Sequence, residues 1–288
     1  MHKERISPVY PKIGEPSMKT RFKTGAWLFA AVCVVLAFSH VSWIVNLCVI
    51  FLCLFSAWEM GIALGFKQKV TPFILELLLV GFLLALPAEI YFWIVLVLFV
   101  TMVIFFGILM TGVGRIKDLK LSEKNLQFLM IPVFFSAIKH IRLEPDPYGL
   151  LQLTIAILVC SITDSFAYLV GRKFGKHKLA PRISPSKTVE GCIGGSISTM
   201  IFLLAAGLCL QLSGLMEVNF LKFGLYVLTA SLVGQYGDLC MSSVKRIEGI
   251  KDYSELLPGH GGILDRFDSQ LFVLPYTYLF LEICGKIF

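Results

Sequence analysis

Charged residues are scarce in this 288-residue sequence: Asp, Glu, Lys and Arg make up 16% of it, against about 25% in an average soluble domain. Apolar residues account for 57% of the chain and are spread along its whole length. This composition excludes an ordinary soluble globular domain, whose surface needs more charge. It predicts a polytopic integral membrane protein.

Several common motifs are missing as well. The eight cysteines are scattered, with no Cys-x-x-Cys pair and no Cys/His cluster, so we expect neither a disulfide framework nor a zinc site. There is no Walker A motif and no Gly-x-Gly-x-x-Gly fingerprint, and the glycines at 191–196 (GCIGGS) indicate helix packing. No cleavage site of small residues follows the basic segment 1–24, so we expect the first apolar segment to be retained.

Long apolar runs predict the fold class, which is all-α with about nine transmembrane helices. A helix needs about 20 residues to cross the hydrocarbon core, and the shorter runs would require tilting or local thinning of the bilayer. The nine runs lie at 26–39, 41–60, 72–87, 90–111, 125–141, 149–171, 191–212, 219–240 and 269–286.

The distribution of basic residues predicts the orientation of these helices. If the N-terminus is cytoplasmic and there are nine spans, the cytoplasmic segments hold 22 of the 26 Lys and Arg residues. The positive-inside rule requires such a bias, and losing one span would spoil it. The net charge of +7 is thereby explained by cytoplasmic loops, and nucleic acid is not an expected partner.

Three segments follow from this topology. Residues 1–24 form a polar basic cytoplasmic tail, residues 25–141 the N-terminal transmembrane helices, and residues 142–288 a C-terminal transmembrane region. Its two long cytoplasmic loops, at 172–190 and 238–268, flank two spans that form a hairpin. Both loops are therefore expected to meet at one membrane face.

Acidic residues in or beside the apolar runs are the first candidates for function. Asp164 lies in the sixth run and Asp238 at the end of the eighth, where a carboxylate is costly and usually faces a polar interior. A polar contact between helices is the alternative for both. It is the favoured interpretation for Glu59 and Glu76, which adjoin no other motif.

The stretch PGHGGILDRFD, at 258–268, combines a glycine-rich turn with two acids. Asp265 and Asp268 are spaced i, i+3 and share one face if a helix begins there. A divalent cation would relieve their repulsion, and hard oxygen ligands suit Mg²⁺. The alternative is a charged rim at the start of a helix, where acids are favoured in any case.

Basic and hydroxyl residues supply the complementary chemistry. In ISPSKTVEG, Ser184, Lys187 and Thr188 lead into the seventh run, and hydroxyls, a lysine and helix N-terminal amides together could hold phosphates. Lys245 and Arg246 add two cations from the other loop. The simpler interpretation is an orientation signal and attraction to anionic headgroups. Together with acids that suit Mg²⁺, these residues indicate phosphoryl or nucleotidyl transfer onto a lipid.

Residues 243–268, SVKRIEGIKDYSELLPGHGGILDRFD, resemble the signature of the phosphatidate cytidylyltransferases, also called CDP-diacylglycerol synthases. The matching pattern is Ser, Lys-Arg, Lys-Asp, Pro-x-His-Gly-Gly and Asp-Arg-x-Asp. The resemblance continues in DSFAYLVGRKFGKHKLAPRISPSKTVEG (164–191) and in GDLCMSSVKR (237–246). The first 140 residues resemble the family only in hydropathy.

The resemblance implies transfer of CMP from CTP to phosphatidate, giving CDP-diacylglycerol and pyrophosphate, with Mg²⁺ and room for a second cation. The implied partners are CTP, phosphatidate and membrane lipids. The implied catalytic residues are Asp238, Lys245, Asp265 and Asp268, and the three aspartates of this group, with Asp164, are the implied metal ligands. The residues implied to bind substrate are Ser184, Lys187, Thr188, Arg246 and His260.

Two positions depart from the family, and two other functions stay open. Ser186 stands where the family often has Lys, and Met241 where it usually has Glu, so metal affinity could be altered. The alternatives are an ion-coupled transporter using Asp164 and Asp238, or a CTP-dependent kinase or transferase acting on another lipid. The oligomeric state, a homodimer included, is left open. The compact chain resembles the bacterial members, which implies an inner (cytoplasmic) membrane and an active site on its cytoplasmic face.

Overall fold

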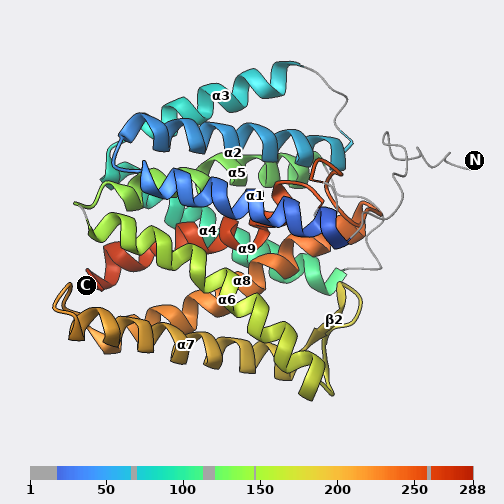
Figure 1. Cartoon of the computed structure of the whole chain (residues 1–288). Helices are drawn as coiled ribbons and strands as arrows, with labels where there is room; N and C mark the ends of the chain where they lie inside the picture. Colours follow the sequence, from blue (N-terminus) through green and yellow to red (C-terminus); the bar gives the residue numbers. More distant parts are fainter. Residues whose placement is uncertain (1–17, 66–69, 113–120, 146, 258–260, 288) are drawn as a thin grey trace, which may run out of the picture.

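The computed structural model describes residues 18–65, 70–112, 121–145, 147–257 and 261–287. Within these residues the chain forms nine α-helices and one two-stranded antiparallel β-hairpin, so the all-α class is confirmed apart from the hairpin (Figure 1). The elements are α1 Met18–Ala37, α2 Ser42–Ala63, α3 Val70–Ala85, α4 Ala88–Gly112, α5 Leu121–Arg142, α6 Tyr148–Phe174, β1 Lys178–Ala180, β2 Ser184–Thr188, α7 Val189–Leu212, α8 Phe220–Ile247 and α9 Leu264–Cys284.

Two helices extend well beyond the apolar runs that predicted them. Helix α8 continues through Asp238 as far as Ile247, with Lys245 and Arg246 in its last turn, where cations are favoured. Helix α9 begins at Leu264, five residues before its apolar run. The expected loop 238–268 is therefore confined to residues 248–263, and most of its charged motif residues lie on helices.

The composition of the helices agrees with an integral membrane protein. Among the described residues, α2, α4, α6 and α7 are long and apolar enough to cross a bilayer. Large apolar side chains of α4 point outward, as Trp93, Val97 and Ile108 do, and such a surface suits lipid rather than water. The interior holds an aromatic cluster in which Phe106 and Phe134 make edge contacts with Phe272 of α9.

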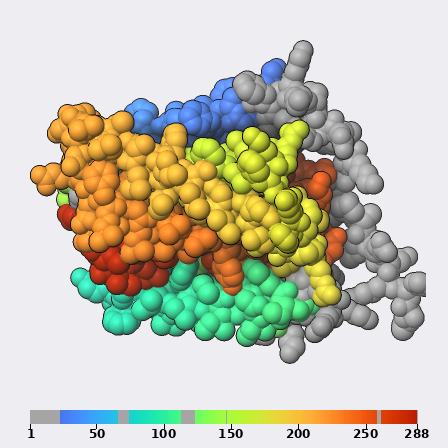
Figure 2. Space-filling view, turned by 90° about the horizontal axis from the view of Figure 1, so that it is seen from below, coloured from blue at the N-terminus to red at the C-terminus, as the bar shows by residue number. Residues whose placement is uncertain are grey.

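Helices α6 and α7 approach each other closely through the glycines of GCIGGS. A Cβ added to Gly191 would lie 2.7 Å from the carbonyl oxygen of Ala167. One added to Gly194 would lie 2.5 Å from Cγ1 of Val170. Figure 2 shows α7 lying across this face of the molecule, with the yellow residues of the hairpin at one end of it. The predicted role of these glycines in helix packing is confirmed.

Gly195→Ala tests this packing, because its Cβ would lie 2.8 Å from Cβ and 3.0 Å from Cα of Ala167. The free energy of unfolding is expected to fall by about 1–3 kcal/mol, as is usual for overpacking. Thermal unfolding of the purified protein in detergent measures the change. Gly81→Ala is the matched control, since a Cβ there meets nothing within 4 Å. Equal melting temperatures of the two variants would contradict the close contact.

Candidate active site

Four chain segments bring the predicted motif residues to one end of the helix bundle. They are the second half of α6, the β-hairpin, the end of α8 and the start of α9. Figure 1 shows the hairpin and the α8–α9 loop at this end, with the C-terminus at the other. Arg246 of α8 fastens the hairpin to the bundle, because its Nε donates a hydrogen bond of 3.1 Å to the carbonyl oxygen of Ile183.

Asp238 of α8 makes a second contact between the bundle and the hairpin. Its Oδ2 forms an ion pair with Nζ of Lys187 from β2. Its Oδ1 accepts a hydrogen bond of 3.1 Å from Oγ of Ser242, one turn further along α8. Both charged side chains are only partly exposed and Nζ of Lys187 itself is buried, so the ion pair is enclosed where the hairpin meets the bundle.

Asp164 and Asp268 complete an acid cluster with Asp238. Asp164 interacts electrostatically with Asp238 and Lys187, and Asp268 with Asp238, Asp164 and Lys245. Gly237 allows α8 and α9 to come together here, because a Cβ on it would lie 2.9 Å from Phe272. Like charges that interact in this way favour either a compensating cation or protonation of one of the carboxylates.

The carboxylate oxygens of the acid cluster suit a magnesium ion, but these side chains alone do not surround one. Carboxylate oxygens are the ligands that Mg²⁺ prefers, usually one or two together with waters and substrate phosphates. No group of three His, Cys, Asp or Glu side chains in the described part of the chain is set closely enough to hold a metal ion by itself. Part of the coordination would therefore come from substrate or water.

Asp265 is occupied by donors of the protein itself. Its Oδ1 accepts a hydrogen bond of 2.7 Å from Nζ of Lys245. Its Oδ2 accepts from the backbone N–H groups of Tyr253 at 2.8 Å and Gly262 at 2.9 Å. The Asp265 and Lys245 side chains are 2% and 9% exposed, so this is a buried ion pair. Asp265 thus fixes Lys245 and the loop, and its role as a metal ligand stays a prediction.

Tyr253 supports this ion pair, although the sequence did not single it out. Its ring lies under Lys245, with Nζ 5.2 Å from the ring centroid. Burial, reinforced by the Asp265 carboxylate, raises the pKa of Tyr253 well above its ordinary value. The phenol therefore stays neutral and donates a hydrogen bond of 3.0 Å to the carbonyl oxygen of Met241.

The sequence of this chain matches a known protein family. The model of the cytidylyltransferase family matches residues 19–284, nearly the whole chain. The chain belongs to the cytidylyltransferase family.

Several curated relatives carry the name phosphatidate cytidylyltransferase. The relative from Bacillus subtilis (strain 168) is 46% identical over 138 residues, which are 48% of this chain and 50% of the relative. The relative from Staphylococcus saprophyticus is 41% identical over 165 residues, 56% of this chain and 61% of the relative. The relative from Staphylococcus aureus (strain COL) is 45% identical over 145 residues, 48% and 52% of the two chains. The match thus spans about half the length of these relatives.

The other residues predicted to bind substrate have structural contacts. Thr188 is the N-cap of α7, and its hydroxyl accepts a hydrogen bond of 3.1 Å from the N–H of Gly191. The guanidinium of Arg246 also donates to the carbonyl oxygen of Ile250 at 3.1 Å. Ser184 is half-buried in β2, and His260 lies outside the described residues. Their contacts with substrate stay predictions.

Met241, one of the two departures from the family pattern, is fully buried in the apolar core. Its backbone carbonyl accepts the hydrogen bond from Tyr253 and so links α8 to the following loop. The Met241 side chain thus packs in the core, and the effect of the departure on metal affinity stays a prediction.

Two carboxylates that organise this end of the bundle were not predicted to do so. Glu190 accepts hydrogen bonds from the backbone N–H groups of Lys176 at 3.0 Å and His177 at 3.2 Å, and so shapes the entry to the hairpin. Glu59 of α2 bonds to the start of α9 and to the loop before it. Its partners are about 200 residues away in the chain, which is why no local motif marks it. Glu76, by contrast, is buried with no hydrogen-bond partner at its Oε1.

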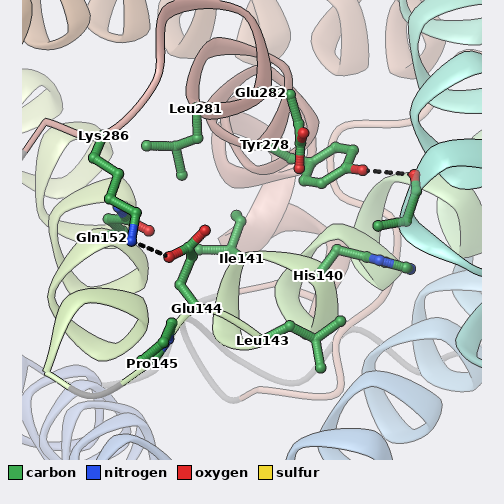
Figure 3. A pocket seen from close by; sticks show the side chains of 11 residues that line it. His140, Ile141, Leu143, Glu144, Pro145, Gln152, Tyr278, Leu281, Glu282 and Lys286 are labelled. Carbon is green, nitrogen blue, oxygen red and sulfur yellow. Dashed lines mark hydrogen bonds and ion pairs between the residues drawn. The ribbon is translucent and has the colours of Figure 1, made fainter.

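A pocket of about 240 Å³ lies at the opposite end of the bundle (Figure 3). His140, Gln152 and Tyr278 line it, and Lys286 forms an ion pair of 3.2 Å with Glu144 at its edge. Tyr278 follows Asp265 by thirteen residues on the same helix, which is about 20 Å at the helical rise of 1.5 Å per residue. This pocket is therefore separate from the acid cluster.

Proposed function

We propose that this protein transfers CMP from CTP to phosphatidate, forming CDP-diacylglycerol and releasing pyrophosphate. The observation that carries the proposal is the convergence of Lys187 with Asp164, Asp238 and Asp268, from four separate elements, at one end of a membrane-embedded bundle. Such a set of acids and a cation is what a reaction between two polyanions requires. The names of the curated relatives support the same reaction.

The reaction needs charge neutralisation and positioning more than proton transfer. A phosphate oxygen of phosphatidate attacks the α-phosphorus of CTP, and the bond from that phosphorus to the β-phosphate oxygen breaks. The second pKa of a phosphate monoester is about 6, so the nucleophile is ionised at neutral pH without an enzymatic base. Pyrophosphate takes the bonding electrons as it leaves.

Each charged residue of the site has a distinct proposed task. Asp164, Asp238 and Asp268 would hold Mg²⁺, which supplies positive charge to the phosphates. Lys187, which is paired with Asp238, would bind an incoming phosphate in place of part of that contact. Lys245 is held by Asp265, and its ammonium interacts favourably with the Asp268 carboxylate.

We also propose nine membrane-spanning helices with a cytoplasmic N-terminus. The ratio of 22 cytoplasmic to four external Lys and Arg residues supports this orientation. The site then faces the cytoplasm at a bacterial cytoplasmic membrane, where CTP is available. Phosphatidate would reach it from the surrounding lipid.

The decisive experiment follows the position of the label from CTP. Purified protein in detergent is incubated with phosphatidate, Mg²⁺ and CTP carrying ³²P at either the α- or the γ-phosphate. Label in the lipid extract is expected from α-labelled CTP alone, and chelation of the metal with EDTA is expected to abolish it. Transfer of the γ-label instead would indicate a lipid kinase. Absence of any lipid product from folded protein would refute the proposal.

A further inference from the structure

Glu59 of α2 is a fully buried carboxylate directed at the N-terminus of α9. Its Oε2 accepts a hydrogen bond of 2.7 Å from the N–H of Leu264, and its Oε1 one of 2.9 Å from the N–H of Ile263. Ile263 is the N-cap of α9 and provides no side-chain cap. The first N–H groups of a helix lack partners within the helix, so Glu59 supplies this cap from a distant segment.

The loop before α9 is held by the same carboxylate. Oγ of Ser254 donates a hydrogen bond of 2.6 Å to Oε1 of Glu59. From the other side, Asp265 accepts from the backbone of Tyr253 and Gly262. Two carboxylates thus bind the three consecutive N–H groups of residues 262–264 and both flanks of the loop. The start of α9, the helix that carries Asp265 and Asp268, is therefore held in place by both carboxylates.

The two glycines at 261 and 262 fit this arrangement closely. A Cβ on Gly262 would lie 2.5 Å from both carboxylate oxygens of Glu59. Gly261 has φ +78°, which L-residues rarely adopt, and its Cβ would lie 2.9 Å from Oδ2 of Asp265. The Gly-Gly pair therefore gives each carboxylate access to the backbone.

We propose that Glu59 is a positioning residue of the active site: it caps α9 and holds residues 261–264, so that Asp265 and Asp268 lie where catalysis needs them. The N-terminal helices, which carry none of the predicted motif residues, thereby contribute directly to the site. The kinetic consequence rests on the function proposed above. The structural consequence, protection of the N–H groups of Ile263 and Leu264, does not.

The first test is kinetic and uses Glu59→Gln, with Glu76→Gln as the matched control. A glutamine amide has one acceptor oxygen where the carboxylate has two, so one backbone N–H at the start of α9 loses its partner. For the folded enzyme we expect kcat to fall roughly ten- to hundredfold, the usual cost of misplacing catalytic groups, with the KM for CTP little changed. Glu76→Gln is expected to keep the wild-type kcat. A purely structural role would reduce the yield of folded protein but not the kcat per folded molecule.

Gly262→Ala makes the same test without altering the carboxylate. Its Cβ would displace Glu59 from the backbone, so the same loss of kcat is expected. Glu59→Asp, which keeps the charge, is expected to retain more activity than Glu59→Gln. Wild-type kcat per folded molecule in both Glu59→Gln and Gly262→Ala would overturn the proposal.

The second test measures hydrogen exchange of the backbone amides of Ile263 and Leu264, which donate to Glu59, by mass spectrometry. In Glu59→Gln these amides are expected to exchange at least about tenfold faster than in the wild type, the change that loss of a hydrogen bond to a charged group produces. Glu76→Gln should leave them unchanged. Unchanged exchange in Glu59→Gln would overturn the proposal. This readout needs no turnover, so it separates failure of the cap from failure of the proposed reaction.

Discussion

Asp238→Asn is expected to lower the kcat of cytidylyl transfer by at least about 100-fold, the usual cost of removing one group that stabilises charge in a transition state. Asp238 is the acid that contacts Lys187 directly and lies beside both other acids of the cluster. Asparagine has nearly the same shape and keeps an oxygen for the hydrogen bond from Ser242. The loss of activity is thus expected without loss of the fold. Initial rates with α-labelled CTP measure it.

The matched control for this substitution is Glu217→Gln. Glu217 is exposed in the turn between α7 and α8, so its removal changes the net charge equally but leaves the acid cluster intact. It is expected to retain wild-type kcat. If Asp238→Asn were as active as Glu217→Gln, Asp238 would have no catalytic role.

Asp265→Leu is expected to lower the free energy of unfolding by about 3–5 kcal/mol, because it leaves the buried Lys245 ammonium without a counter-charge. The carboxylate also holds two backbone N–H groups that would lose their acceptor. Thermal or denaturant unfolding in detergent measures the effect. The double variant Lys245→Met/Asp265→Leu should recover part of the loss, since it removes both charges.

The exposed pair of Glu144 and Lys286 provides the control for this stability effect. Its side chains are 37% and 56% exposed, and the two groups lie 3.2 Å apart. Glu144→Gln is expected to change stability by about 1 kcal/mol or less, as for other surface ion pairs. An equal, small effect of Asp265→Leu would contradict the assignment of Asp265 as a buried anchor.

Apolar runs predicted the helices well, because length and hydropathy alone decide whether a segment is buried in lipid. They could not predict how far α8 and α9 continue as polar helices beyond those runs. The β-hairpin was also missed: both its strands, KLA and SPSKT, are short, and the second is polar and contains a proline. Its formation depends on contacts with Glu190 and Arg246 rather than on a strand pattern.

The acids of the site were predicted from type and spacing, but their individual roles depend on tertiary contacts. Asp265 and Asp268 look equivalent in the sequence. In the structure Asp265 is enclosed by Lys245 and Tyr253, whereas Asp268 faces the acid cluster. Glu59 looked like a simple contact between helices because its partners lie on the far side of the sequence.

The glycine contacts between α6 and α7 bear on how the two parts of the site are held together. A Cβ on Gly171 of α6 would lie 2.8 Å from Oγ1 of Thr188, so α6, β2 and α7 pack closely here. These elements carry Asp164 and Lys187, while Asp238 and Asp268 belong to α8 and α9. Nε2 of Gln235 on α8 donates a hydrogen bond of 2.9 Å to Oγ of Ser196 on α7, which joins the two groups of elements inside the bundle. The geometry of the acid cluster therefore depends on the packing between two pairs of helices, and not on either pair alone.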